Sequence, residues 1–117
     1  MSKSVTPFVY NAILERVIDG DTIDVTLDLG FDVKLHKQRC RLNGIDTPES
    51  RTRNLEEKAL GLQAKERLKE LCADKLVIQS HGKGKYGRIL ATPFTKDGKD
   101  ICQALVKEGH AVAYWGG

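Results

Sequence analysis

The sequence lacks the features that mark disulfide-linked, zinc-binding and membrane-spanning proteins. Its three cysteines, Cys40, Cys72 and Cys102, are an odd number, lie far apart and show no CxxC or Cys/His spacing. This pattern argues against both a disulfide framework and a zinc site. No apolar run reaches the length of a signal-peptide core or of a membrane span. We therefore expect a soluble, cytoplasmic protein with no membrane partner, whose cysteines are free thiols in the core.

What the sequence does contain is enough for one compact domain. It has 117 residues, 40% of them hydrophobic, and neither repeats nor low-complexity segments divide it. A chain of this size builds a single hydrophobic core, so we expect one domain over residues 1–117, with residues 1–7 frayed. Lys and Arg outnumber Asp and Glu by 19 to 16, giving a net charge of +3. This mild excess is compatible with an anionic partner but does not identify one.

The first part of the chain has the alternating pattern of β-strands. Alternating apolar residues predict three consecutive antiparallel strands, at Phe8–Ile18, Ile23–Leu27 and Val33–Leu42. Turns are expected at residues 19–21 and 28–30, where Asp and Gly cluster. In the first strand, Ile13 and Val17 are the predicted inward positions.

The remainder predicts helices and two further strands. Apolar residues at helical intervals predict a helix over Leu55–Cys72, with Asn54 and Glu57 at capping-box spacing and Gly61 inside it. The polar linker at residues 50–53 has no apolar anchor, so we expect a mobile loop. The later part of the chain predicts, in order, a strand at 76–80, a glycine-rich loop at 81–87, a strand at 88–92, a turn at 97–98, a short helix from 100 to 109 and an extended tail.

This order of elements predicts a mainly β fold with helices, of the α+β class. Three strands, a long helix, two strands and a short helix fit a five-stranded OB-fold barrel, a fold that binds nucleic acids or oligosaccharides. Fold alone does not give the activity.

Four clusters of charged residues could carry chemistry. Each has a simpler reading on its own, as turn chemistry, as a polar strand face or as a solvated loop. Together they supply carboxylates from two turns and cations from two further segments, which is the inventory for a hard divalent cation beside a phosphodiester. The clusters are Asp19 with Asp21, Arg39 with Arg41, Asp46 with Glu49, and Lys83 with Lys85 and Arg88.

Three separated motifs, VIDGDTIDV, RLNGIDTPE and KYGR, resemble the signature of the staphylococcal nuclease (thermonuclease) family. The match continues through LVKEGHAVAY and covers nearly the whole chain. The resemblance implies an OB-fold barrel with helices and a calcium-dependent phosphodiesterase. Its secreted archetype cuts DNA and RNA to products with 3′-phosphates.

The resemblance also implies roles for individual residues. Asp21, Asp46 and the backbone carbonyl of Thr47 would bind calcium, with Asp19 nearby through water. Glu49 would orient or deprotonate the attacking water, and Arg41 and Arg88 would hold the scissile phosphate. Positions that contact the terminal phosphate and the nucleotide correspond to Lys85, Tyr86 and Tyr114. Arg39 has no catalytic counterpart and is expected to be a surface charge.

The sequence departs from that archetype at its end and leaves two other functions open. We expect a monomer; because the sequence stops at residues 115–117 without the archetype's C-terminal helix, a dimer is the alternative. A catalytically inactive module that binds nucleic acid or protein is one alternative function, and an OB-fold that binds an acidic oligosaccharide is another. The presence of the acids together with both arginines argues against the inactive module, because binding needs positive charge but not that acid set.

Overall fold

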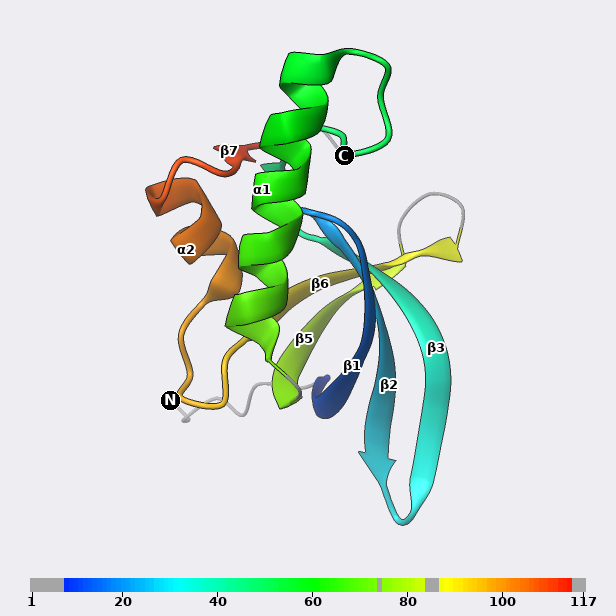
Figure 1. Cartoon of the computed structure of the whole chain (residues 1–117). Coiled ribbons are helices and arrows are strands. Elements are labelled where there is room, and N and C mark those ends of the chain that lie inside the picture. Colours follow the sequence, from blue (N-terminus) through cyan, green and yellow to red (C-terminus); the bar gives the residue numbers. More distant parts are fainter. Residues whose placement is uncertain (1–7, 74, 84–86, 115–117) are drawn as a thin grey trace.

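Five strands close into a barrel in the computed structural model, which describes residues 8–73, 75–83 and 87–114 (Figure 1). Around the barrel the order is β1-β2-β3-β6-β5. Neighbouring strands are antiparallel except β3 and β6, which run parallel. The closed five-stranded barrel confirms the predicted OB-fold. The strands are β1 (Val9–Asp19), β2 (Thr22–Gly30), β3 (Val33–Leu42), β5 (Lys75–Lys83) and β6 (Ile89–Phe94).

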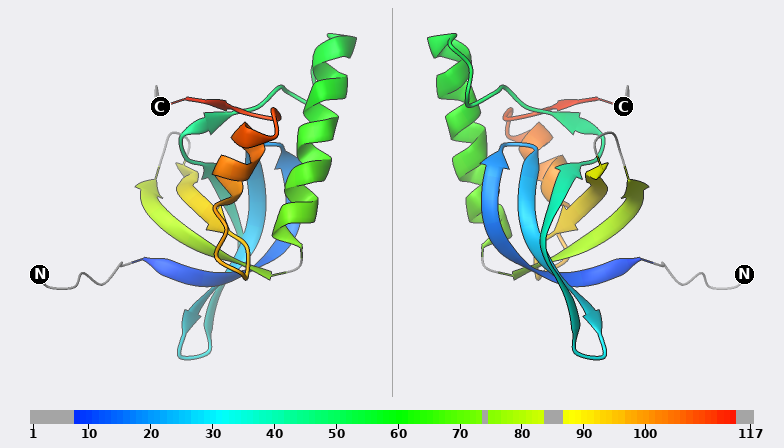
Figure 2. Two further views of the ribbon diagram at one scale, coloured as in Figure 1. Left: turned by 90° about the vertical axis from the view of Figure 1, so that its left-hand side faces the viewer. Right: turned by 90° about the vertical axis from the view of Figure 1, so that its right-hand side faces the viewer.

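Two helices and a small sheet complete the fold. Helix α1 (Leu55–Cys72) has the predicted bounds and packs along β1, while α2 (Ile101–Lys107) packs against α1 and β6. Strands β4 (Ile45–Asp46) and β7 (Val112–Ala113) pair at one end of the barrel, and the β2–β3 hairpin projects from the other (Figure 2). This two-residue pairing was not predicted, because such short strands carry no periodicity. No helix among the described residues is long and apolar enough to cross a membrane.

The core fills the barrel and the space beneath the two helices. Alternate residues of β2 point inward, as do Cys40 and Leu42 at the end of β3. Leu68 of α1 and Leu105 of α2 close the barrel from outside with no exposed surface. All three cysteines are buried and free, as predicted. Burial raises the pKa of each thiol to about 12, so they are neutral packing groups at physiological pH.

Local backbone irregularities correct some of the predicted details. Ile13 is 45% exposed, not inward, because a bulge between Leu14 and Arg16 shifts the alternation of β1 by one residue; Val17 is buried as predicted. The second turn lies at Phe31 and Asp32, beyond the predicted Asp-Leu-Gly, and both residues adopt left-handed φ angles near 60° (58° and 61°). Strand β5 also continues to residue 83, through the start of the predicted glycine-rich loop.

Candidate active site

A cavity of about 210 Å³ lies where the β1–β2 turn, β3 and the segment after β4 meet. Asp19, Asp21, Thr22, Arg41, Asp46, Thr47, Pro48, Glu49 and Arg88 line it. The structure therefore brings together all three residues expected to be catalytic and all three expected to bind metal. Tyr114 does not line the cavity; it is partly exposed, and its backbone N–H donates to the Gly44 carbonyl. Lys85 and Tyr86 lie outside the described residues.

The barrel assembles the cavity from segments far apart in the sequence. Pairing of β2 with β3 sets Thr22 opposite Arg41, so the β1–β2 turn lies beside the arginine. Parallel pairing of β3 with β6 sets Arg41 opposite Leu90, which brings the segment before β6, with Arg88, to the same place. No single stretch of sequence contains the site, because strand pairing creates it.

Asp21 is the buried hub of the cavity. Its carboxylate accepts hydrogen bonds from the Thr22 hydroxyl at 3.0 Å and from the Thr47 backbone N–H at 3.2 Å. The Arg41 guanidinium lies 3.5 Å from the same carboxylate. One buried acid thus ties the β1–β2 turn to β3 and to the segment after β4.

Asp46 shares the same arginine but lies in an electrostatically less favourable position. Its carboxylate is 3.4 Å from the Arg41 Nη2 atom, and 53% of its side chain is exposed. Partial burial raises the pKa of Asp46, and the neighbouring Asp21 charge raises it further, while Arg41 works in the opposite direction. Two carboxylates therefore face one cation, an arrangement that a second cation would stabilise.

The donor chemistry fits a calcium ion, although the acids are few. Among the described residues no group of three or more His, Cys, Asp or Glu side chains lies close enough to hold a metal ion. Calcium, however, accepts backbone carbonyls and water beside carboxylates. Asp21, Asp46 and the Thr47 carbonyl are such a set of hard oxygen donors, and the two carboxylates lie 3.5 and 3.4 Å from the same Arg41 guanidinium.

Close packing fixes the segment that carries Thr47 and Glu49. A Cβ atom on Gly61 of α1 would lie 2.4 Å from the Glu49 carbonyl oxygen, and one on Gly20 would lie 2.9 Å from the Thr47 hydroxyl. Only glycine allows such an approach of helix and turn. The segment from Thr47 to Glu49 is therefore clamped between the β1–β2 turn and α1.

Polar contacts complete the clamp. Ser50 is buried and its hydroxyl donates to Asp19, while the Glu57 carboxylate accepts from the Glu49 N–H at 3.4 Å. A mobile loop was predicted at residues 50–53 because they lack an apolar anchor; Ser50 instead has a polar one. Asn54 caps α1 as predicted, by accepting from the Glu57 N–H at 3.1 Å. Ser50 and Gly20 were not predicted to support the site; Gly61, a glycine inside a helix, was the one visible signal.

Comparison with known proteins places these features in a family. The model of the staphylococcal nuclease homologue family matches residues 39–116. The chain is 40% identical over 111 residues to the SPbeta prophage-derived endonuclease YokF of Bacillus subtilis (strain 168), covering 91% of this chain and 35% of the relative. Its identity to endonuclease YncB of the same strain is 39% over 111 residues, covering 91% of this chain and 49% of the relative.

A further relative is an uncharacterized endonuclease of Escherichia coli, 35% identical over 100 residues, which is 85% of this chain and 58% of that protein. The chain thus spans between about a third and three fifths of the length of these relatives. The family model covers well over half of the chain, and the relatives agree with it. This chain therefore belongs to the staphylococcal nuclease family.

Proposed function

We propose that this domain is a calcium-dependent nuclease that hydrolyses phosphodiester bonds of DNA, RNA or both. The observation that carries the proposal is the cavity itself, in which Arg41 lies between Asp21 and Asp46 and is joined by Glu49 and Arg88. The names of the relatives support a nucleic acid as the substrate, since three of them are endonucleases. An inactive binding module would not need this combination of acids and arginines.

The arginines hold and neutralise the scissile phosphate. Guanidinium groups bind phosphate oxygens through two parallel N–H donors, and such fixed donors stabilise the charge that develops at phosphorus during the displacement. Arg41 is held for this task, because it donates to the Leu42 carbonyl at 2.7 Å and contacts two carboxylates. Its position is set before substrate arrives.

Asp21, Asp46 and the Thr47 carbonyl would hold the calcium ion. When bound there, calcium would supply the positive charge that polarises the phosphate and orients water. Glu49 would accept a proton from the attacking water, whose oxygen forms the new bond to phosphorus. The bond from phosphorus to the 5′ oxygen breaks, and that oxygen takes a proton from solvent water, so the products are a 3′-phosphate and a 5′-hydroxyl.

A digestion assay with end-labelled single-stranded DNA tests this proposal. We expect cleavage with calcium, none with a calcium chelator, and 3′-phosphate ends on the products. Glu49→Gln should lower turnover by about 10²–10⁴-fold, the usual contribution of a general base. Glu66→Gln is the matched control, because Glu66 is an exposed residue of α1 outside the cavity.

The outcome also separates the alternatives. Absence of calcium-dependent cleavage by the folded protein would contradict the catalytic proposal. Nucleic acid binding without cleavage would instead identify an inactive binding module. Binding of an acidic oligosaccharide without any binding of nucleic acid would identify the third function considered from the sequence.

A further inference from the structure

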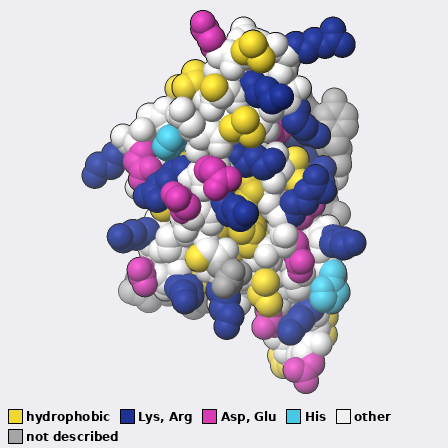
Figure 3. Space-filling view, viewed as in Figure 1, with side chains coloured by type: hydrophobic (Ala, Val, Ile, Leu, Met, Phe, Trp, Pro, Cys, Tyr) yellow, Lys and Arg dark blue, Asp and Glu magenta, His cyan; other side chains and the backbone are white. Residues whose placement is uncertain are grey.

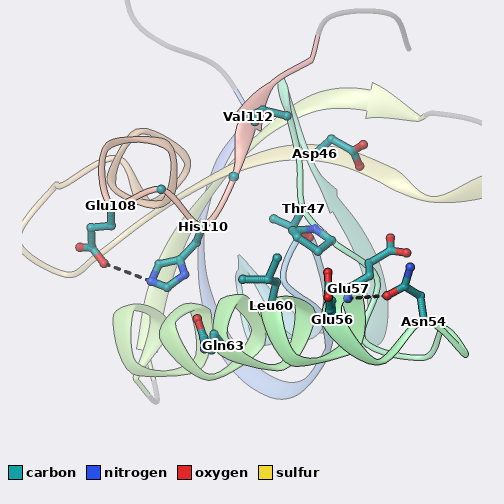
Figure 4. Close-up of a pocket in the computed structure, with 13 residues that line it drawn as sticks. Asp46, Thr47, Asn54, Glu56, Glu57, Leu60, Gln63, Glu108, His110 and Val112 are labelled. Carbon is teal, nitrogen blue, oxygen red and sulfur yellow. Dashed lines mark hydrogen bonds and ion pairs between the residues drawn. The ribbon is translucent and has the colours of Figure 1, made fainter.

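Two larger grooves adjoin the catalytic cavity, and they carry opposite charge. A groove of about 620 Å³ is lined by Lys37, Arg39 and Arg88, with Asp24 and Gly87, and shares Arg88 with the cavity. A groove of about 610 Å³ between α1, α2 and β7 shares Asp46, Thr47 and Pro48 with the cavity (Figure 4). We call them the basic groove and the acidic groove.

We propose that the basic groove binds the sugar-phosphate backbone of the substrate strand next to the scissile phosphate. The inference rests on the proposed function and names the path of the substrate through the same site. A polynucleotide carries one negative charge for every nucleotide, so the phosphates next to the scissile one favour an adjoining groove that is basic over one that is acidic. Charge decides which groove receives them.

Strand geometry lines up the cations of the basic groove with the cavity. Arg39 and Arg41 alternate with the buried Cys40, so they lie on the same outer face of β3, about 6.6 Å apart along the strand. The parallel register pairs Cys40 with Ile89, and continuing it by one residue brings Arg88 beside Arg39. The three arginines therefore form one continuous row from the cavity into the groove.

Arg39 is held in place but keeps donors for a phosphate. Asp24 accepts two hydrogen bonds from it, from Nε at 2.9 Å and from Nη2 at 3.1 Å. A guanidinium has five N–H donors, so three remain for another acceptor. Asp24 is thus a positioning residue, which fixes the arginine while leaving its outer edge open.

Lys37 extends the row where β3 departs from regular geometry. The β2–β3 register shifts between Val25 and Leu27, and Lys37 adopts a left-handed φ of 55°. A bulge of this kind redirects side chains and recurs beside functional sites. Here it places an exposed lysine on the groove, beyond Arg39 and away from the cavity.

The acidic groove excludes the same strand. Four carboxylates line it, from Asp46, Glu56, Glu57 and Glu108, and Figure 4 shows them around a space whose other walls include Leu60 and Val112. His110 is the one other titratable residue in that lining among the described residues, and it lies near Glu108. Arg67 donates to Glu108 at 2.6 and 2.9 Å, and Asp46 contacts Arg41. Repulsion of phosphates by the remaining carboxylates, Glu56 and Glu57, therefore directs the strand to the other side.

Substrate length tests the path of the strand. The variant Lys37→Gln/Arg39→Gln is compared with wild type on a single-stranded DNA of twenty nucleotides and on a dinucleotide, whose one phosphodiester leaves no neighbouring phosphate for the groove. We expect kcat/KM to fall about tenfold on the long strand, mainly through KM, with kcat and the dinucleotide rate within about twofold of wild type. The dependence of log KM on log salt concentration should weaken by about 0.7 for each phosphate that the variant no longer neutralises.

Controls separate this path from a general loss of charge. Lys34→Gln removes a cation from the same strand outside the groove and should change neither rate by more than about twofold. Arg39→Lys, with Lys37 left unchanged, should keep most of the wild-type kcat/KM on the long strand. Equal losses on both substrates, or the same loss from Lys34→Gln, would overturn the inference. If wild type cleaves neither substrate, it is the proposed function that fails, and direct binding of the long strand then still compares the same variants.

Discussion

Arg39 and Arg41 lie two residues apart on one face of β3, yet their surroundings differ in kind. Arg39 is matched by a single carboxylate, Asp24, through a two-pronged pair at 2.9 and 3.1 Å. Arg41 is shared by two carboxylates, Asp21 and Asp46, at 3.5 and 3.4 Å. The charges of Arg39 and Asp24 balance one another, whereas two carboxylates beside the single charge of Arg41 leave an excess of negative charge.

The pKa values of Asp24 and Asp46 are shifted in opposite directions. Arg39 lowers the pKa of Asp24 by hydrogen bonding, whereas burial and the charge of Asp21 raise the pKa of Asp46. A lowered pKa means that the folded state stabilises the ionised carboxylate, and a raised pKa means that it does not. At Asp24 the arginine contact thus outweighs the cost of burial, whereas at Asp46 burial and the charge of Asp21 outweigh the arginine contact. Carboxylates with a raised pKa are candidates for functional sites.

The partners also come from different kinds of structure. Asp24 lies on β2 directly opposite Arg39 in the register, so the barrel itself fixes that pair. Asp46 lies at the end of β4, and the following residues are held by contact with Gly20 and Gly61. The Arg41 cluster therefore depends on tertiary packing that the Arg39 pair does not need.

Replacing each arginine by glutamine gives the largest contrast. With the proposed nuclease activity, Arg41→Gln should lower kcat by about 10²–10³-fold, the cost of losing one donor to the transition state. Arg39→Gln should leave kcat on saturating substrate within about twofold. Steady-state kinetics on single-stranded DNA measure both, and thermal unfolding confirms that both variants fold. Similar losses of kcat would show that the two arginines have the same role.

The Arg39 and Arg41 contrast shows where sequence reasoning succeeds. Strand alternation and helix capping are local patterns, so they predicted the barrel strands and the bounds of α1. The acid and arginine clusters were visible, and the resemblance to a family gave their expected roles. The pairing of Arg39 with Asp24, however, depends on the register of β2 and β3, which a bulge shifts between Val25 and Leu27.

Other features were invisible for related physical reasons. The bulge in β1 moved Ile13 outward, and no residue in that strand marks the extra position. The small sheet of β4 and β7 joins segments that are far apart in sequence.

Over the face that carries α1, cationic and acidic side chains are interspersed (Figure 3). The opposite charges of the two grooves therefore emerge from folding, not from composition.

Substituting Gly61 tests the dependence on packing. Alanine favours helix by about 1 kcal/mol over glycine, yet its Cβ would lie 2.4 Å from the Glu49 carbonyl oxygen. We expect Gly61→Ala to lower the free energy of unfolding by about 1–3 kcal/mol, the usual cost of overpacking. Activity should fall with the displaced Glu49, while the Asp24–Arg39 pair stays intact.

Chemical denaturation and kinetics measure these effects, and Ala59→Gly is the matched control. Ala59 is exposed on the same helix, so the reverse change should cost only about 1 kcal/mol and leave turnover unchanged. A stabilised, fully active Gly61→Ala protein would show that α1 does not clamp the segment.

Neutralising Asp24 or Asp46 should have the smallest effects, and the two changes in the free energy of unfolding should differ in sign. Asp24 has a lowered pKa, so its contribution to stability is present above the unfolded value of 3.8 and is lost as pH falls through the folded pKa. Asp24→Asn should therefore lower the free energy of unfolding at pH 7 by up to about 1 kcal/mol, as for other pairs near the surface. This loss should disappear in acid.

Asp46 has a raised pKa, so its ionised form opposes folding at neutral pH, and this penalty disappears as pH falls through the raised value toward 3.8. Without calcium, Asp46→Asn should leave stability at pH 7 unchanged or raise it by less than about 1 kcal/mol. Urea unfolding in chelator at neutral and acidic pH measures both variants. Adding calcium should then stabilise wild type but not Asp46→Asn, because ligand binding to the folded state raises its stability. Destabilisation by both variants at pH 7 in chelator would mean that Asp46 is a structural partner of Arg41 in the same way that Asp24 is of Arg39.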